Sequence, residues 1–228
     1  LFVKELEAAL REGRVDLTVH SCKDLPMNLP EELPVVAFLR REDPRDALVL
    51  PEGAESLVGP IGSASPRRRF QLRKLFPELE VRPVRGNVQT RLRKLDGGEY
   101  GALVLAAAGL KRLGLEGRIS RYFQPEELLP AAGQGILAVQ CRADMDRAVF
   151  DCLRDPAAEA CAMAERAFVR ALDGGCSSPI AAYAETEGEG ITVTGLYADE
   201  EDRLWRGAIS GPAGDGTALA RTLAKKLK

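Results

Sequence analysis

The segment VHSCKDLP, residues 19–26, places several polar and ionisable side chains directly after an apolar run. The preceding DLTV reads as a buried strand, and the segment after it contains the only histidine of the sequence, His20, with Lys23 and Asp24. In open α/β sheets the end of a strand opens into the ligand crevice, so polar side chains there face a ligand. The segment therefore predicts part of a functional site.

Asp24 is the candidate for chemistry in this segment. A carboxylate between Lys23 and a proline-fixed turn, facing a basic crevice, would be ionised and could stabilise a developing cation or move a proton. The alternative is an aspartate that caps a loop, which is the favoured interpretation of this residue alone. His20 has no serine or cysteine motif beside it and is interpreted as structural.

A second segment, GSASPRRRFQLRK (62–74), runs from a strand through small hydroxyl residues into an arginine-rich helix. Free N–H groups at the helix N-terminus, the hydroxyls of Ser63 and Ser65 and the forks of Arg67 and Arg68 together predict a carboxylate or phosphate site. A helix with a solvated basic face explains the arginines alone equally well.

Two later segments favour the anion site. RGNVQTR places Arg85 at a strand end and Arg91 about one turn into the next helix, and AGLKRLG places Arg112 after a buried run. Residues 61–121 hold 14 Lys and Arg against 5 Asp and Glu, whereas residues 122–202 hold 5 against 16. The chain uses 24 arginines and 8 lysines, and the planar arginine fork suits carboxylates. One region is therefore expected to bind anions.

Two other functions use the same features. A nucleic-acid-binding protein also needs arginines, but the net charge is −2, aromatic residues are 5%, and the arginine region offers few stacking rings. Small polyanions are expected instead, with no nucleic-acid partner. A non-catalytic module that captures a small carboxylate ligand stays open, because its fold and arginines would be the same.

Cysteine usage indicates one unusual thiol. In ALDGGCSSPIAAY (171–183) two glycines precede Cys176 and permit a sharp, exposed turn. An inert thiol is the favoured interpretation of this motif alone. The five cysteines contain no CxxC pair, which argues against a metal site or a disulfide framework. Cys141, Cys152 and Cys161 are interpreted as packing residues.

Length and patterning predict an α/β protein of two or three domains. No apolar run reaches the roughly 20 residues that span a bilayer, and the start of the sequence reads as an amphipathic helix, so a cytoplasmic protein without a membrane partner is expected.

Alternating strands and helices with short connections predict a mostly parallel sheet up to residue 109. After Cys176, alternating apolar and polar residues predict antiparallel hairpins covered by a last helix. The predicted strands are 15–19, 35–39, 46–50, 58–62, 79–84, 102–109 and 136–140, and the predicted helices are 2–12, 66–76, 87–96, 144–153, 157–172 and 217–228.

Seven motifs in order resemble the porphobilinogen deaminase (hydroxymethylbilane synthase) family: HSCKDLP, REDPRDALV, GSASPRRRFQL, VRGNVQTRLRKLD, AAAGLKRLG, LPAAGQGILAVQCR and GGCSSPI. The resemblance implies two doubly wound domains of the periplasmic-binding-protein type around a cleft, and a smaller α+β domain with an antiparallel sheet. The expected domains are residues 1–41 with 130–153, residues 42–129, and residues 154–228.

The resemblance also implies the reaction. Four porphobilinogen molecules are joined head to tail with loss of ammonia, on a dipyrromethane cofactor attached by a thioether, in an enzyme expected to be a monomer. Cys176 matches the attachment point and Asp24 the catalytic carboxylate. The residues that match carboxylate binders or complete the pocket are Lys23, Ser21, Ser63, Ser65, Arg67, Arg68, Arg85, Arg91 and Arg112. Asn87 and Gln134 are expected to make further contacts, and neither metal nor nucleotide is required.

One departure concerns the start of the chain. The family begins with a strand, a helix and a glycine-rich loop before the motif LFVKELE, whereas this sequence starts at Leu1. The expectation is that the sequence is an incomplete record of an active enzyme.

Overall fold

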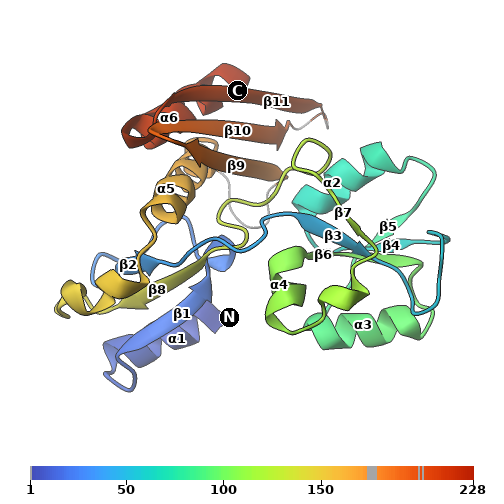
Figure 1. The fold of residues 1–228 in the computed structure, drawn as a ribbon, viewed down its shortest axis with the longest axis horizontal. Helices are drawn as coiled ribbons and strands as arrows, with labels where there is room; N and C mark the ends of the chain where they lie inside the picture. The colour runs from blue at the N-terminus through green and yellow to red at the C-terminus, as the bar shows by residue number, and fades with distance from the viewer. Residues whose placement is uncertain (1, 174–178, 200, 202) are drawn as a thin grey trace.

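The computed structural model describes residues 2–173, 179–199, 201 and 203–228. Its strands form three sheets, each with its own helices (Figure 1). The helices are α1 Phe2–Arg11, α2 Pro66–Leu75, α3 Val88–Asp96, α4 Ala107–Arg112, α5 Pro156–Ala171 and α6 Gly216–Leu227. The strands are β1 Leu17–Ser21, β2 Val35–Phe38, β3 Asp46–Val49, β4 Ile61–Gly62, β5 Val81–Arg82, β6 Ala102–Ala106, β7 Arg121–Tyr122, β8 Leu137–Cys141, β9 Ile180–Glu187, β10 Gly190–Ala198 and β11 Leu204–Pro212.

The first sheet has the order β1-β8-β2, so its central strand comes from a distant part of the sequence. β8 runs antiparallel to both neighbours, with Val139 opposite Val19 on one side and Ala37 on the other. The predicted strand 136–140 therefore lies in one sheet with strands from the start of the chain, as the grouping of residues 130–153 with residues 1–41 implies. The chain therefore crosses twice between the first and second sheets, once before β3 and once before β8.

The second sheet has the order β5-β4-β6-β3-β7 and is mixed. β4 pairs parallel with β5 and β6, and α2 and α3 make the two crossovers between them. β3 and β7, by which the chain enters and leaves this sheet, pair antiparallel. Because β6 and β7 both run antiparallel to β3, β7 has the same direction as β4, β5 and β6. The prediction of a mostly parallel sheet therefore holds for four of the five strands and was wrong for β3, which no helix connects to β4.

Several boundaries also differ from the predictions. The apolar run 102–109 divides into β6 and α4 at Ala107, because a short buried run rich in alanine suits either state. The predicted helix 144–153 is a 3-10 turn over Arg147–Leu153 in which only Phe150 is buried. Cys152 lies exposed on this turn, so its interpretation as a packing residue was wrong, whereas Cys141 and Cys161 are buried as expected.

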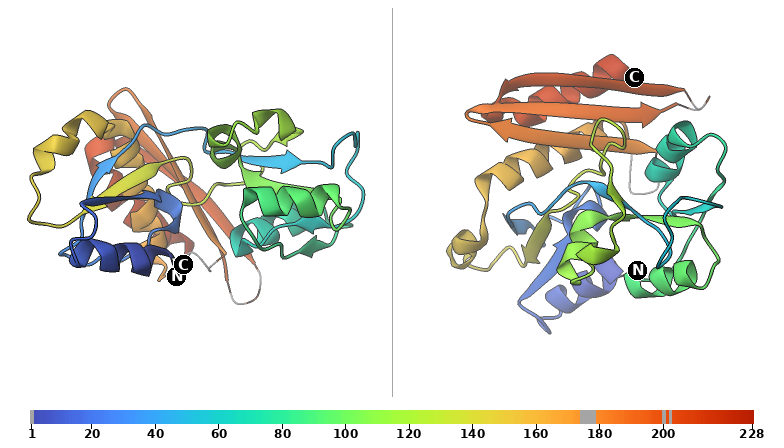
Figure 2. Two further views of the ribbon diagram at one scale, coloured as in Figure 1. Left: turned by 90° about the horizontal axis from the view of Figure 1, so that it is seen from below. Right: turned by 45° about the vertical axis from the view of Figure 1, so that its right-hand side comes forward.

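The third sheet, β11-β10-β9, is antiparallel throughout, as predicted. Helices α5 and α6 pack on it, and Phe168 of α5 lies in its core with Val193. α5 also contacts β2 of the first sheet, and Figure 2 shows it between the two sheets. The α/β class with a smaller antiparallel part is therefore confirmed. None of the described helices has the length and apolar character to cross a bilayer.

The chain crosses between the first and second sheets through residues 39–45, before β3, and residues 123–136, before β8. These two crossing segments lie side by side. Glu42 N–H donates to the Gly135 carbonyl at 3.1 Å, and Gly135 has a φ of +89°. A Cβ atom on Gly135 would lie 2.3 Å from the Glu42 carbonyl oxygen, so this contact requires glycine. The close contact fixes how the first and second sheets face each other.

Candidate active site

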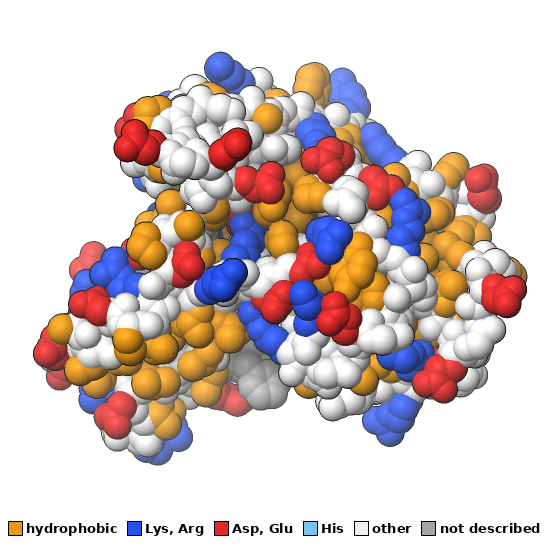
Figure 3. Space-filling view, in the orientation of Figure 1, with side chains coloured by type: hydrophobic (Ala, Val, Ile, Leu, Met, Phe, Trp, Pro, Cys, Tyr) orange, Lys and Arg blue, Asp and Glu red, His pale blue; other side chains and the backbone are white. Residues whose placement is uncertain are grey.

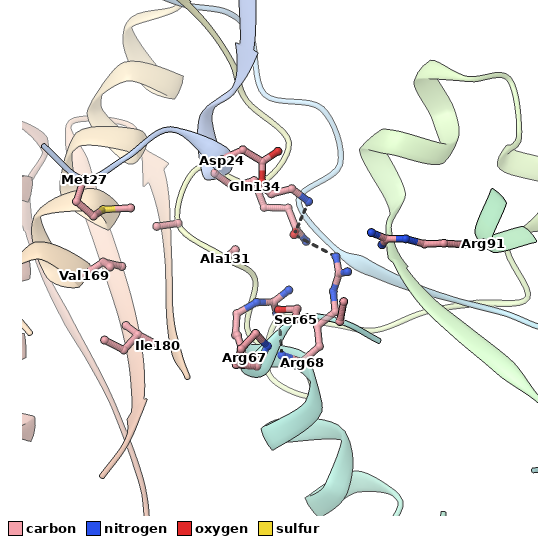
Figure 4. Close-up of a pocket in the computed structure, with 14 residues that line it drawn as sticks. Asp24, Met27, Ser65, Arg67, Arg68, Arg91, Ala131, Gln134, Val169 and Ile180 are labelled. Carbon is pink, nitrogen blue, oxygen red and sulfur yellow. Dashed lines mark hydrogen bonds between the residues drawn. The ribbon is translucent and has the colours of Figure 1, made fainter. Parts of the chain in front are cut away.

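A cavity of about 390 Å³ lies where the crossing segments meet α2, α3 and α5 (Figure 4). Its lining combines cationic side chains with a carboxylate and an apolar wall. The lining residues are Lys23, Asp24, Met27, Ala64, Ser65, Pro66, Arg67, Arg68, Arg91, Ala131, Ala132, Gln134, Val169 and Ile180. On the face seen in Figure 3, Lys and Arg side chains lie near the middle, interspersed with Asp and Glu side chains.

Asp24 ends a 3-10 turn, Cys22–Asp24, that directly follows β1. Cys22 and Leu25 on either side of the turn are fully buried, while Asp24 itself is exposed to the cavity. Cys22 N–H donates to the Ile136 carbonyl at 2.9 Å. The turn is therefore anchored by its apolar residues and displays its carboxylate, as the sequence predicted.

Arg67 and Arg68 lie in the first turn of α2, which Ser65 caps by accepting the Arg68 N–H at 3.4 Å. Both arginines are buried, with exposed fractions of 3% and 7%. Asp46, at the start of β3, pairs with both: its Oδ2 lies 2.8 Å from Arg67 Nη1, and its Oδ1 lies 2.7 Å from Arg68 Nη2. The two guanidinium groups are thus held by an internal carboxylate.

Sequence reasoning missed Asp46. It lies in REDPRDALV, where the sequence predicts the boundary between the first two domains and the strand 46–50. The available signal was an acidic residue at the start of a fully buried strand, since a buried carboxylate needs cationic partners. Burial raises the pKa of Asp46, but the charges of Arg67 and Arg68 outweigh burial and hold it well below its usual range.

Arg91 reaches the cavity from α3, opposite Asp24 and Arg68 in Figure 4. Its Nε donates to the Gly86 carbonyl at 2.8 Å. Burial, followed by the charge of Arg68, lowers its pKa. Among the described contacts of Arg91 there is no ion pair with a protein carboxylate, so its charge faces the cavity.

Lys23 lines this cavity and also a smaller one of about 50 Å³. Ser21 and Arg112 line the smaller cavity, and Arg112 Nη2 donates to the Gly135 carbonyl at 2.6 Å. Burial, and then the charge of Arg68, lowers the pKa of Lys23 to about 8. The structure therefore places three predicted binding residues around a second cavity, which shares Lys23 with the first.

Three other residues that were predicted to bind the ligand have exposed positions or protein partners instead. Arg85 is exposed and lines neither cavity. The side chain of Asn87 caps α3 by accepting the Thr90 N–H at 2.8 Å. Gln134 is fully buried, with its amide bonded to Pro44 and Asp46.

Cys176 lies outside the described residues. Val169 and Ile180, which precede and follow it in the sequence, both line the larger cavity.

His20 is confirmed as a structural residue. It is 6% exposed, and its Nε2 lies 2.9 Å from Thr18 Oγ1. Burial lowers its pKa. It does not line either cavity.

The residues fit an acidic ligand. Arg67 lines the larger cavity, and its Nε is buried without a hydrogen-bond partner among the described residues. Ser63 Oγ is also buried without such a partner, but Ser63 lines neither cavity. Unpaired buried donors are costly unless a ligand or water satisfies them. An α/β protein with a carboxylate and several guanidinium groups around one cavity belongs to the class that binds or processes small polyacids.

Comparison with known proteins gives the family. Residues 1–149 match the porphobilinogen deaminase dipyromethane cofactor binding domain, and residues 159–228 match the porphobilinogen deaminase C-terminal domain. Proteins named porphobilinogen deaminase from Acetivibrio thermocellus, Alkaliphilus oremlandii and Ruminiclostridium josui are 51%, 50% and 52% identical to this chain. Each alignment covers 100% of this chain and 78% of the relative.

The chain belongs to the porphobilinogen deaminase family, transferases that polymerise porphobilinogen into hydroxymethylbilane and use a dipyrromethane cofactor. Among solved structures, an ABC transporter from Parabacteroides distasonis aligns over 65% of this chain and 56% of its own, with a TM-score of 0.43 and 17% identity. The family assignment depends on the sequence matches alone.

Proposed function

We propose that Asp24 is the catalytic carboxylate of porphobilinogen polymerisation in this chain, and that the cationic side chains around it bind the acidic groups of substrate and cofactor. One observation carries the proposal: Asp24 shares a single cavity with Lys23, Arg67, Arg68 and Arg91. The cations would hold a ligand whose rings carry carboxylates. The carboxylate of Asp24 is then left to face the reacting centre.

The role of Asp24 follows from the charge that the reaction develops. When an amino group leaves as ammonia, positive charge develops on the pyrrole that it leaves. A carboxylate fixed beside that charge stabilises it more strongly in a cavity than in water, because fewer water molecules screen it. Since Asp24 belongs to an anchored turn, it needs little reorganisation to do this.

The cations divide into two groups. Arg67, Arg68 and Arg91 line the larger cavity, and Arg112 lines the smaller one together with the neutral Ser21. Lys23 lines both cavities. Two cavities that share Lys23 suit a ligand that extends by one acidic ring at a time. Ser63 and Ser65 offer hydroxyl groups near the same helix N-terminus, whereas Arg85 lies on the exposed loop before α3 and lines neither cavity.

The cofactor supplies the primer on which the chain of pyrroles grows. We assign Cys176 as its attachment point, because Val169 and Ile180 bring the flanking sequence to the cavity wall. A thiol at that position forms a thioether when its sulfur displaces the amino group of a porphobilinogen unit and ammonia is released.

The three sheets support the proposed domains, residues 1–41 with 130–153, residues 42–129 and residues 154–228. We also propose that the protein is a monomer, as the family resemblance implies. The four described cysteines are free, which supports a reducing compartment such as the cytoplasm.

Intact mass measurement tests this proposal. The purified protein is expected to exceed its sequence mass by two pyrrole units, and limiting porphobilinogen is expected to add further units, each one porphobilinogen less one ammonia. Cys176→Ser is expected to show the bare mass before and after substrate, whereas Cys152→Ser, at an exposed thiol, retains the additions. A folded wild-type protein that shows only its bare mass in both conditions would contradict the proposal.

A further inference from the structure

Asp46 is a fully buried charged group beside the cavity. Its side chain has no exposed surface, and Arg68 donates to its Oδ1 from both Nε at 3.0 Å and Nη2 at 2.7 Å. The remaining oxygen pairs with Arg67 Nη1 at 2.8 Å. A two-pronged contact of this kind fixes the plane of a guanidinium group as well as its position.

Gln134 links this carboxylate to the turn that carries Asp24. Its Nε2 donates to Asp46 Oδ1 at 2.8 Å and to the Pro44 carbonyl at 2.7 Å. Its Oε1 accepts from Lys23 Nζ at 3.4 Å. An amide has two N–H donors, and both are used within the protein. The sequence had predicted a ligand contact for Gln134, but neither N–H of its amide is left for a ligand.

The remaining acceptors of the arginine pair are the Gln134 Oε1, which accepts from Arg68 Nη2 at 3.5 Å, and two backbone carbonyls. Arg67 Nη1 donates to Leu129 at 2.6 Å, and Arg68 Nη1 donates to Val104 at 3.2 Å. Without Asp46, two adjacent buried guanidinium groups would repel each other and keep only their hydrogen bonds to these carbonyls and to Gln134. Lys23, Arg67, Arg68 and Asp46 together leave two net positive charges, so the site still attracts an acidic ligand.

We propose that Asp46 and Gln134 are positioning residues: together they hold Arg67, Arg68 and Lys23 in the orientation in which these cations meet the carboxylates of the ligand. This inference rests on the proposed function, because it assumes that the three cations bind the acidic substrate and cofactor. Asp46 and Gln134 act through these cations and do not touch the reacting atoms.

The first test uses substitutions of similar volume. Asp46→Asn removes the charge, and Gln134→Met removes the amide, and each is expected to lower kcat/KM for porphobilinogen by about 10-fold to 100-fold. Asp43→Asn is the matched control, since Asp43 pairs with Arg45 and lines neither cavity. The control is expected to stay within about twofold of wild type, as for a partly exposed pair.

The second readout distinguishes positioning from a general loss of structure. Asp24 and Asp46 raise the pKa of Lys23, while burial, Arg68 and Arg67 lower it. Asp46→Asn is therefore expected to move the alkaline limb of kcat/KM to lower pH. Gln134→Met changes no charge but removes an acceptor of the Lys23 ammonium, so it is expected to move the limb in the same direction by a smaller amount. A merely structural defect would scale the whole profile without moving it.

The outcomes separate the two proposals. Wild-type kcat/KM in folded Asp46→Asn or folded Gln134→Met would overturn the inference, and so would an unmoved limb in folded Asp46→Asn. If Asp46→Asn does not fold, the kcat/KM of Gln134→Met decides alone. A wild-type protein that does not consume porphobilinogen would instead refute the proposed function.

Discussion

Arg41 Nη1 lies 2.7 Å from Glu165 Oε1, and this ion pair joins the first crossing segment to α5. Glu165 also accepts the N–H groups of Gly133 at 2.6 Å and Ala184 at 2.7 Å. One fully buried carboxylate therefore ties both crossing segments to the third sheet. The contacts set the relative positions of the elements that surround the cavity.

Removing this carboxylate should destabilise the fold. Glu165→Gln leaves the Arg41 guanidinium without its counterion in a buried environment, and the free energy of unfolding is expected to fall by about 3 kcal/mol or more. Denaturant unfolding measures the change. Glu159→Gln on the same helix breaks a partly exposed pair with Arg154 and is expected to cost less than about 1 kcal/mol. Equal losses in the two variants would contradict the role given to Glu165.

Arg91 should be needed for chain growth. Its charge faces the cavity and pairs with no described protein carboxylate, so Arg91→Leu removes a binding group for the growing polyacid. Intact mass after addition of porphobilinogen is expected to show bound chains that stop short of four added units. Arg93→Leu, on the exposed side of α3, is the control and is expected to release full product. The same mass distribution in both variants would argue against a binding role for Arg91.

The pH dependence of kcat/KM should include Lys23. Because burial and Arg68 lower its pKa to about 8, its positive charge is lost as pH rises through that value, and kcat/KM is expected to fall. Lys23→Met should be less active below pH 8 and should lack this limb. An unchanged limb in Lys23→Met would exclude Lys23 as its source.

For stability the effect of pH on Lys23 has the opposite sign. Between about pH 8 and pH 10.5, the ordinary pKa of lysine, the unfolded chain binds more protons than the folded chain, so the contribution of Lys23 to stability improves over that range.

Much of the site could be predicted because its parts are local in sequence. The turn with Asp24 follows one strand, and Arg67 and Arg68 follow Ser65 at one helix N-terminus, so strand ends and helix caps locate them. Asp46 and Gln134 could not be placed in this way. Their roles depend on partners 22 and 88 residues away, across a crossing whose register is set by contacts such as that of Gly135 with Glu42.

The parts of the fold that could not be predicted also depend on contacts between segments that are distant in the sequence. Alternation and turn residues were enough for the third sheet, where successive strands pair with each other. The direction of β3 against β6 depends on how the chain enters the second sheet, which the hydrophobic pattern does not encode. The division of residues 102–109 between β6 and α4 depends on tertiary packing, because an alanine-rich run is buried in either state.

The most direct measurement is the rate of ammonia release by Asp24→Asn, compared with wild type and with Asp16→Asn. Asp16 is an exposed aspartate that lines neither cavity. The account predicts that Asp24→Asn keeps the two-unit mass addition yet releases ammonia at least about 100-fold more slowly, because one fixed carboxylate no longer stabilises the cationic transition state. Asp16→Asn should match wild type. Ammonia release by folded Asp24→Asn at the wild-type rate would contradict the central claim.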